Sequence, residues 1–154
     1  MKELCYPFDS AYIIKKKRSI KKALLADGSQ RIEKRIAVLG GSTTGDIVAT
    51  LELFLLDNGI QPAFYESEYN AYWQDAMFGN EELDSFKPDV IFIHTSNRNI
   101  TETLSMAMTR EQVDEALDRQ LEHFTVMWKK LSEKFGCAII QNNFELPLYR
   151  LLGN

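Results

Sequence analysis

The pattern of hydrophobic positions along the chain takes two forms, and each form predicts one kind of element. Four short apolar runs predict buried β-strands over residues 36–39, 62–65, 90–93 and 138–141. Apolar residues at helical spacing predict an amphipathic helix within the N-terminal arm, 7–25, and further helices over 44–57, 73–78 and 109–135. The chain therefore alternates between strands and helices.

Local signals at the helix ends support these boundaries. Asn58-Gly59 follows the helix 44–57 and is typical of a C-terminal cap. Thr109 and Gln112 are spaced as a capping box at the start of the longest helix. Gly136 is expected to end that helix, directly before the last strand.

Alternating strands and helices predict an α/β fold, a three-layer αβα sandwich with a mostly parallel sheet. Right-handed crossovers restrict the topology, and we expect the strand order 2-1-3-4. A length of 154 residues suits a single domain, 1–154, in which residues 1–30 form an N-terminal arm and helix.

Composition and charge narrow the class of protein. The chain is 45% apolar and 26% charged, as ordinary soluble domains are, and its net charge of −4 gives no indication of a nucleic-acid partner. The basic run between residues 15 and 22 is interpreted as a solvated helix face. No apolar stretch approaches the roughly 20 residues that span a bilayer, and no signal peptide is expected.

The two cysteines point to a reducing compartment. Cys5 and Cys137 lie far apart in the sequence and lack metal-ligand spacing. We expect two buried or half-buried thiols, no metal and a cytoplasmic protein.

Ligands of open parallel sheets bind beyond the carboxyl ends of the strands, so the residues that follow each strand are the candidates. Polar residues follow all four predicted strands, at 40–44, 66–70, 94–99 and 142–145. The third of these loops contains six polar residues in succession. The sequence therefore predicts a binding site at this edge of the sheet.

Three chemistries could use the first loop, and two of them bind phosphate. Gly40 and Gly45 have the spacing of a nucleotide P-loop, but Asp46 stands where that motif needs lysine, so a P-loop is excluded. Residues 42–46 also resemble the FMN phosphate loop of flavodoxins, in which hydroxyls and backbone N–H groups bind the phosphate. Tyr69, Tyr72 or Trp73 could stack on a flavin, whereas Asp46 in the first helical turn opposes this alternative.

The third chemistry is nucleophilic. Ser42, the Gly41 N–H and the Asn97 amide could supply a nucleophile and an oxyanion hole. This arrangement resembles SGNH (GDSL-type) hydrolases, although glycine replaces the aspartate of their Gly-Asp-Ser block, and Thr95-Ser96-Asn97 replaces their Gly-x-Asn. The Asp-x-x-His that supplies their base is also missing.

Two histidines are available to replace that base. His94 ends a strand and could reach the site, whereas His123 is expected on the helix surface. Because no aspartate stands at the usual offset to orient His94, Ser42 is predicted to be a poor nucleophile.

Four stretches, "RIAVLGGSTTGDI", "LELFLLDNGIQPAFYESEYNAY", "FKPDVIFIHTSNRNI" and "IIQNNFELP", give a closer resemblance. From about residue 7 onward, the chain resembles the N-terminal SGNH-like domain of FkbH-like proteins. The resemblance implies a downstream haloacid-dehalogenase-type (HAD) domain and the charging of an acyl carrier protein with a glyceryl unit from a phosphorylated three-carbon donor. This chain lacks the Asp-x-Asp motif of HAD phosphatases, so we expect a fragment of a longer protein, partly unsupported over 146–154.

The leading hypothesis is a degenerate SGNH-like domain that assists acyl or glyceryl transfer to an acyl carrier protein, as a binding platform without a cofactor. The alternatives are an esterase or acyltransferase that uses Ser42, and an FMN-binding flavodoxin-like module. Arg98 could make a bidentate contact with a carboxylate or phosphate. The predicted catalytic residues are Ser42, Asn97 and Gly41, and the predicted substrate contacts are Thr43, Thr44, Tyr69, Asn70, His94, Arg98 and Asn99.

Overall fold

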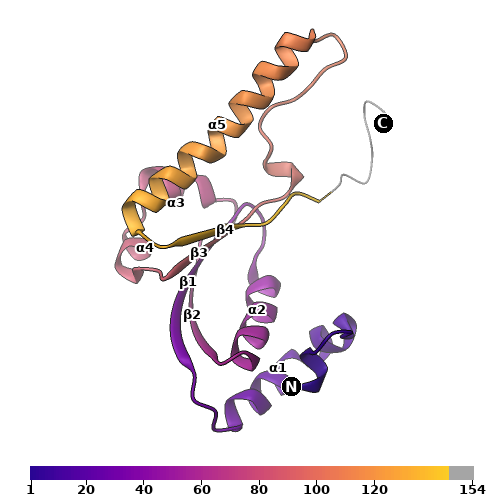
Figure 1. Cartoon of the computed structure of the whole chain (residues 1–154), viewed down its shortest axis with the longest axis vertical. Helices are drawn as coiled ribbons and strands as arrows, with labels where there is room; N and C mark the ends of the chain where they lie inside the picture. The colour runs from indigo at the N-terminus through magenta and orange to yellow at the C-terminus, as the bar shows by residue number, and fades with distance from the viewer. Residues whose placement is uncertain (146–154) are drawn as a thin grey trace.

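In the computed structural model, which describes residues 1–145, four parallel strands form one sheet with helices on both faces (Figure 1). The strands are β1 (Ile32–Gly40), β2 (Ile60–Glu66), β3 (Val90–His94) and β4 (Ala138–Gln141). Their order is β2-β1-β3-β4 and every pair is parallel. The predicted fold class and strand order are confirmed; the expectation for residues 146–154 lies outside the described residues.

The described part of the chain also contains five α-helices and two short 3₁₀ helices, of which one α-helix and one 3₁₀ helix precede β1. The α-helices are α1 (Ser10–Ala26), α2 (Gly45–Asp57), α3 (Tyr72–Phe78), α4 (Glu81–Phe86) and α5 (Arg110–Phe135), and the 3₁₀ helices are η1 (Lys2–Leu4) and η2 (Asn97–Asn99). The capping box of Thr109 and Gln112 is present, and Gly136 ends α5 with a φ of 60°. Helix α4 was not predicted; its signal is Asn80, whose side chain accepts hydrogen bonds from the first-turn N–H groups.

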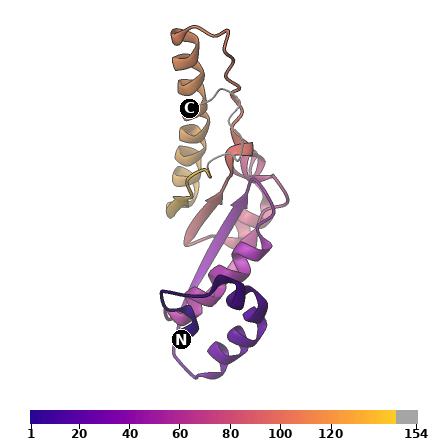
Figure 2. The same ribbon diagram turned by 90° about the vertical axis from the view of Figure 1, so that its right-hand side faces the viewer.

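The alternation of side chains along β1 divides the core between the two faces of the sheet. Ala37 and Leu39 pack against α3, α4 and α5, whereas Ile36 and Val38 face α2. Helix α1 packs on the outer side of α2, where its apolar residues meet Leu53 and Leu56. Both views place α1 at the end of the molecule remote from α5 (Figures 1 and 2).

The predicted apolar face of the longest helix is only partly buried. Phe124 and Leu131 lie in the core, but Leu117 and Leu121 remain 55% and 59% exposed. The reason is geometric, because the first half of α5 extends beyond the sheet (Figure 1). The hydrophobic pattern predicted the helix correctly, but it did not determine how much of the apolar face packs against other elements.

Two further details differ from the sequence prediction or refine it. Cys5 is exposed, so its predicted burial was wrong, whereas Cys137 is half-buried as expected. Strand β1 begins at Ile32, four residues earlier than predicted, because its exposed first half pairs in register with β2 from Ile60 onward. Within residues 1–145, no helix is long and apolar enough to cross a membrane.

Candidate functional site

The loop between β1 and α2 is fixed at the carboxyl end of the sheet by its own backbone. The Gly40 N–H donates to Ser67 Oγ at 2.8 Å, and the Gly41 N–H donates to the carbonyl of His94 at 2.8 Å. These bonds join the ends of the three neighbouring strands β2, β1 and β3. Ser67 lies in the candidate range 66–70 after the second strand, but the sequence did not single it out as a site residue.

Close packing explains why two glycines follow β1. A Cβ atom on Gly41 would lie 2.5 Å from both Nδ2 and Oδ1 of Asn99. A Cβ atom on Gly40 would lie 2.6 Å from Thr44 Cγ2 and 2.9 Å from the carbonyl oxygen of Ser42. Any side chain here would displace the loop or the buried amide beneath it.

The buried carboxamide of Asn99 connects three loops. Its Oδ1 accepts from the Ser96 N–H at 2.9 Å, and its Nδ2 donates to the Gly41 carbonyl at 3.0 Å and to Asn70 Oδ1 at 3.1 Å. Asn70 has a φ of 59°, so its backbone is left-handed where it meets Asn99. The structure thus brings together Gly41, Asn70 and Asn99, all of which were predicted at the site.

Other predicted residues lie around this cluster with their side chains unbonded. Ser42 and Asn97 are half-buried, and no side-chain hydrogen bond to another residue of 1–145 involves either of them. The same holds for the exposed Thr43, Tyr69 and Arg98. Asn99, rather than Asn97, is the third-loop amide that reaches the first loop. The roles assigned to Ser42 and Asn97 stay predictions.

Thr44 differs from its neighbours because it is buried and bonded. Its Oγ1 donates to Glu66 Oε2 at 3.1 Å, which ties the start of α2 to the end of β2. Asp46, in the first turn of the same helix, forms an ion pair with Lys17 of α1 at 2.7 Å, and hydrogen bonding to this lysine lowers the pKa of Asp46. Two carboxylates therefore lie near the start of α2.

The end of β4 holds the third loop from the other side. Thr95 is fully buried; its N–H donates to Asn142 Oδ1 at 3.0 Å, and its carbonyl accepts from Asn142 Nδ2 at 2.8 Å. Gln141 Nε2 donates to the Thr95 hydroxyl at 2.9 Å, and Gln141 Oε1 accepts from the Trp128 indole. These residues position the loop rather than face a ligand.

The two histidines lie on opposite faces of the sheet. His94 continues the side of β3 that faces α2 and packs near the ring of Phe92, with centroids 6.2 Å apart. His123 stacks on Trp73 with centroids 3.7 Å apart, and burial lowers its pKa. Its predicted place on the surface was wrong, because α3 packs against α5 here. No hydrogen bond within residues 1–145 joins either ring to a carboxylate or to Ser42.

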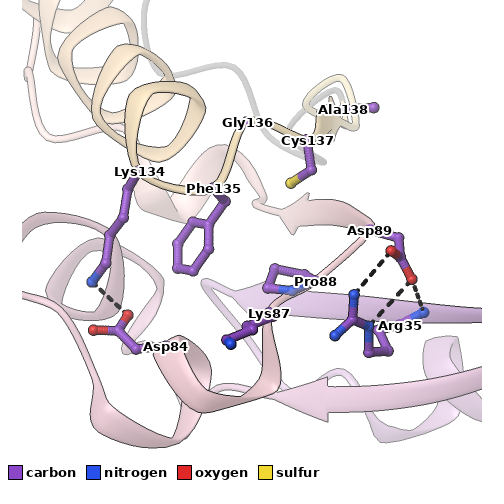
Figure 3. Close-up of a pocket in the computed structure, with 10 residues that line it drawn as sticks. All are labelled: Arg35, Asp84, Lys87, Pro88, Asp89, Lys134, Phe135, Gly136, Cys137 and Ala138. Carbon is purple, nitrogen blue, oxygen red and sulfur yellow. Dashed lines mark hydrogen bonds and ion pairs between the residues drawn. The ribbon is translucent and has the colours of Figure 1, made fainter.

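A separate cavity of about 760 Å³ lies at the opposite, amino ends of the strands (Figure 3). Its charged groups are largely paired with one another: Lys134 with Asp84, and Arg35 with Asp89 at 3.2 Å. Cys137 also lines this cavity, and burial raises the pKa of its thiol. One pair joins α5 to α4 and the other joins β1 to the start of β3, so these charges hold the scaffold and leave the strand-end loops as the stronger candidate site.

A parallel sheet of four strands with helices on both faces defines a three-layer α/β domain, a class in which ligands commonly bind beyond the strand ends. The family model "FkbH, N-terminal domain" matches residues 35–152, and this chain therefore belongs to that family. The resemblance seen in the sequence is confirmed at this level.

One solved structure shares the fold. It is the N-terminal part of a Bacteroides fragilis protein, described as containing a phosphatase domain and complexed with Mg. The two chains are 18% identical with a TM-score of 0.68, and the match covers 91% of this chain and 35% of that one. This chain thus spans about a third of its structural neighbour. No curated protein matches the sequence.

Proposed function

We propose that this domain is a binding platform of an FkbH-type protein, which holds an acyl or glyceryl group during its transfer to an acyl carrier protein. The supporting observation is the contrast at the strand ends. Asn99, Thr95 and Asn142 are hydrogen-bonded within the loops that they fix. The side chains of Ser42, Asn97 and Arg98 form no hydrogen bond within residues 1–145. Loops that are fixed by internal hydrogen bonds, and that carry further polar side chains without such bonds, are suited to binding a ligand.

Binding is favoured over hydrolysis by the placement of the histidines. A serine nucleophile needs a base within hydrogen-bond reach and a group that orients that base. His123 is stacked on Trp73, and His94 points to the α2 face beside Phe92. Within residues 1–145 neither histidine forms a hydrogen bond with Ser42, so the serine esterase or acyltransferase lacks a preformed contact between nucleophile and base.

The same loops disfavour an FMN phosphate. A phosphate at the start of α2 would lie near the carboxylate of Glu66, which accepts from Thr44, and Asp46 in the first helical turn has its charge paired with Lys17. Negative side chains at a helix N-terminus compete with an anionic ligand for the same N–H groups and positive potential. A neutral glyceryl or acyl group meets no such repulsion.

The test uses the glyceryl thioester of N-acetylcysteamine as the probe of carrier-linked cargo. In amide NMR spectra we expect shifts at Ser42, Asn97 and Arg98, and none around Cys137 at the opposite end of the sheet. Arg98→Ala should weaken binding by about 5-fold, the loss of roughly one charge-assisted hydrogen bond. Lys129→Ala, at an exposed position on α5, should bind as the wild type does.

A fluorophosphonate distinguishes the alternatives. The platform predicts no covalent labelling of Ser42 in folded protein. Rapid labelling that Ser42→Ala abolishes would establish an active nucleophile and contradict the platform, as would thioester-induced shifts confined to the Cys137 cavity. Yellow protein that releases FMN on heating would instead establish the flavin module.

A further inference from the structure

Positive charge in this molecule is concentrated on one helix. Helix α1 carries six lysine or arginine residues and no acidic residue, although the whole chain has a net charge of −4. The remainder of the chain therefore carries a net charge of −10. Such segregation creates a local positive potential on an otherwise acidic molecule.

The side of α1 that faces solvent combines these cations with apolar residues. Ile13, Ile20 and Leu24 face the core with α2. Ile14, Arg18, Lys22 and Leu25 follow at steps of four, four and three, so they share one exposed side of the helix, which we call the α1 basic stripe. Ile14 and Leu25 are 60% and 47% exposed, and a shallow hollow of about 490 Å³ lies along the second half of the stripe.

The ion pairs of α1 do not involve the cations of the α1 basic stripe. Lys17 pairs with Asp46 and Lys21 with Glu52, both at 2.7 Å, so these two lysines hold α1 on α2. In the part of the chain that the structure describes, Arg18 and Lys22 form no ion pair. From the sequence alone this basic run was interpreted as a solvated helix face. The structure adds that exposed aliphatic residues flank the two unpaired cations.

The first half of α1 lies close to the loop that follows β1. Asp46, the partner of Lys17, is in the first turn of α2, and that turn directly follows the loop that contains Ser42. A protein bound to α1 would therefore reach the start of α2 at the Lys17 end of the helix.

The observations favour a small acidic protein surface over a membrane or a nucleic acid. A bilayer or a duplex is an extended polyanion and would be repelled by the acidic remainder of the molecule. The stripe also lacks the aromatic residues and wide apolar face of helices that insert into membranes. A compact acidic partner can contact one helix alone and place apolar side chains beside Ile14 and Leu25.

We propose that the α1 basic stripe is the docking surface for an acidic carrier protein that delivers the acyl or glyceryl group to the strand-end site. This inference rests on the platform function proposed above. The charges steer the encounter, and the two aliphatic residues supply the desolvated contact.

Calorimetric titration of the whole chain with a purified acidic acyl carrier protein tests the docking surface. We expect Arg18→Glu combined with Lys22→Glu to weaken binding at least about 10-fold, and an increase in salt from about 50 to about 300 mM to weaken wild-type binding similarly. The matched control, Arg110→Glu with Lys129→Glu on the exposed side of α5, makes the same charge change and should alter binding less than about 3-fold.

Two results would overturn the docking surface: equal losses in both double variants, or no carrier binding. In the second case, α1-dependent binding to phosphatidylserine-containing vesicles would identify a membrane as the occupant instead. Circular dichroism of each variant establishes that it is folded. The thioester titration separates the two proposals. If the thioester binds while the carrier does not, α1 docking fails and the platform stands; if the thioester does not bind, the platform itself fails.

Discussion

Gly41→Ala tests whether steric contact with Asn99 determines the first residue after β1. The new Cβ would lie 2.5 Å from the carboxamide, which is 8% exposed and bonded to Ser96, Gly41 and Asn70. The carboxamide must then move and lose most of these three hydrogen bonds. At about 1 kcal/mol net for each bond, we expect a loss of about 2–3 kcal/mol in the free energy of unfolding.

Urea denaturation followed by circular dichroism measures this loss. Gly45→Ala is the matched control, because no atom lies within 4 Å of its added Cβ and the residue begins α2. Alanine there should leave stability unchanged or raise it by up to about 1 kcal/mol.

A double-mutant cycle identifies the cause. Asn99→Ala removes the same bonds, so Gly41→Ala should cost little more in that background. The reasoning is refuted if the free energy of unfolding of Gly41→Ala is within about 0.5 kcal/mol of the wild-type value. It is also refuted if Gly41→Ala destabilises the Asn99→Ala protein as much as it destabilises the wild type.

Two further predictions concern the scaffold. Tyr65→Phe removes the 2.9 Å hydrogen bond to the buried Asp75 and should destabilise the protein by about 1–3 kcal/mol. Thermal denaturation measures this loss, and the control Tyr69→Phe, at a 77% exposed position, should unfold as the wild type does. Hydrogen bonds from Arg35 lower the pKa of Asp89, so the associated stabilisation is complete above the ordinary carboxyl pKa of about 4 and is lost as pH falls through the lowered value. In Arg35→Gln the free energy of unfolding should therefore fall less steeply below about pH 4 than in the wild type. An acid-unfolding curve as steep as that of the control Lys129→Gln would contradict this.

The order of strands and helices was readable from the sequence because each signal is local. Hydrophobic period, the capping box of Thr109 with Gln112 and the left-handed Gly136 depend on residues within about one helical turn. Right-handed crossovers then restricted the possible strand orders, and the order chosen among them, 2-1-3-4, is confirmed. Helix α4 was missed because it has only six residues, too few for a periodic pattern.

The sequence predicted where the candidate site lies, but it did not predict which of its residues contact one another. That its residues follow the strand ends is a rule of parallel sheets, and Gly41, Asn70 and Asn99 were predicted there on that ground. Which asparagine of the third loop reaches the first loop depends on Asn99 meeting Gly41, 58 residues away. The bonding of Thr95 to Asn142 and the stacking of His123 on Trp73 depend likewise on packing between separate elements.

What the sequence determined by itself was therefore the identity and order of the elements, since these follow from short-range backbone preferences and the burial of apolar faces. The tertiary structure alone decided which polar side chains become scaffold and which remain unbonded, since hydrogen-bond partners across the sheet edge are fixed only when the four strands are in register. It also decided that the cations of α1 divide into a pair that holds α2 and a stripe that faces solvent.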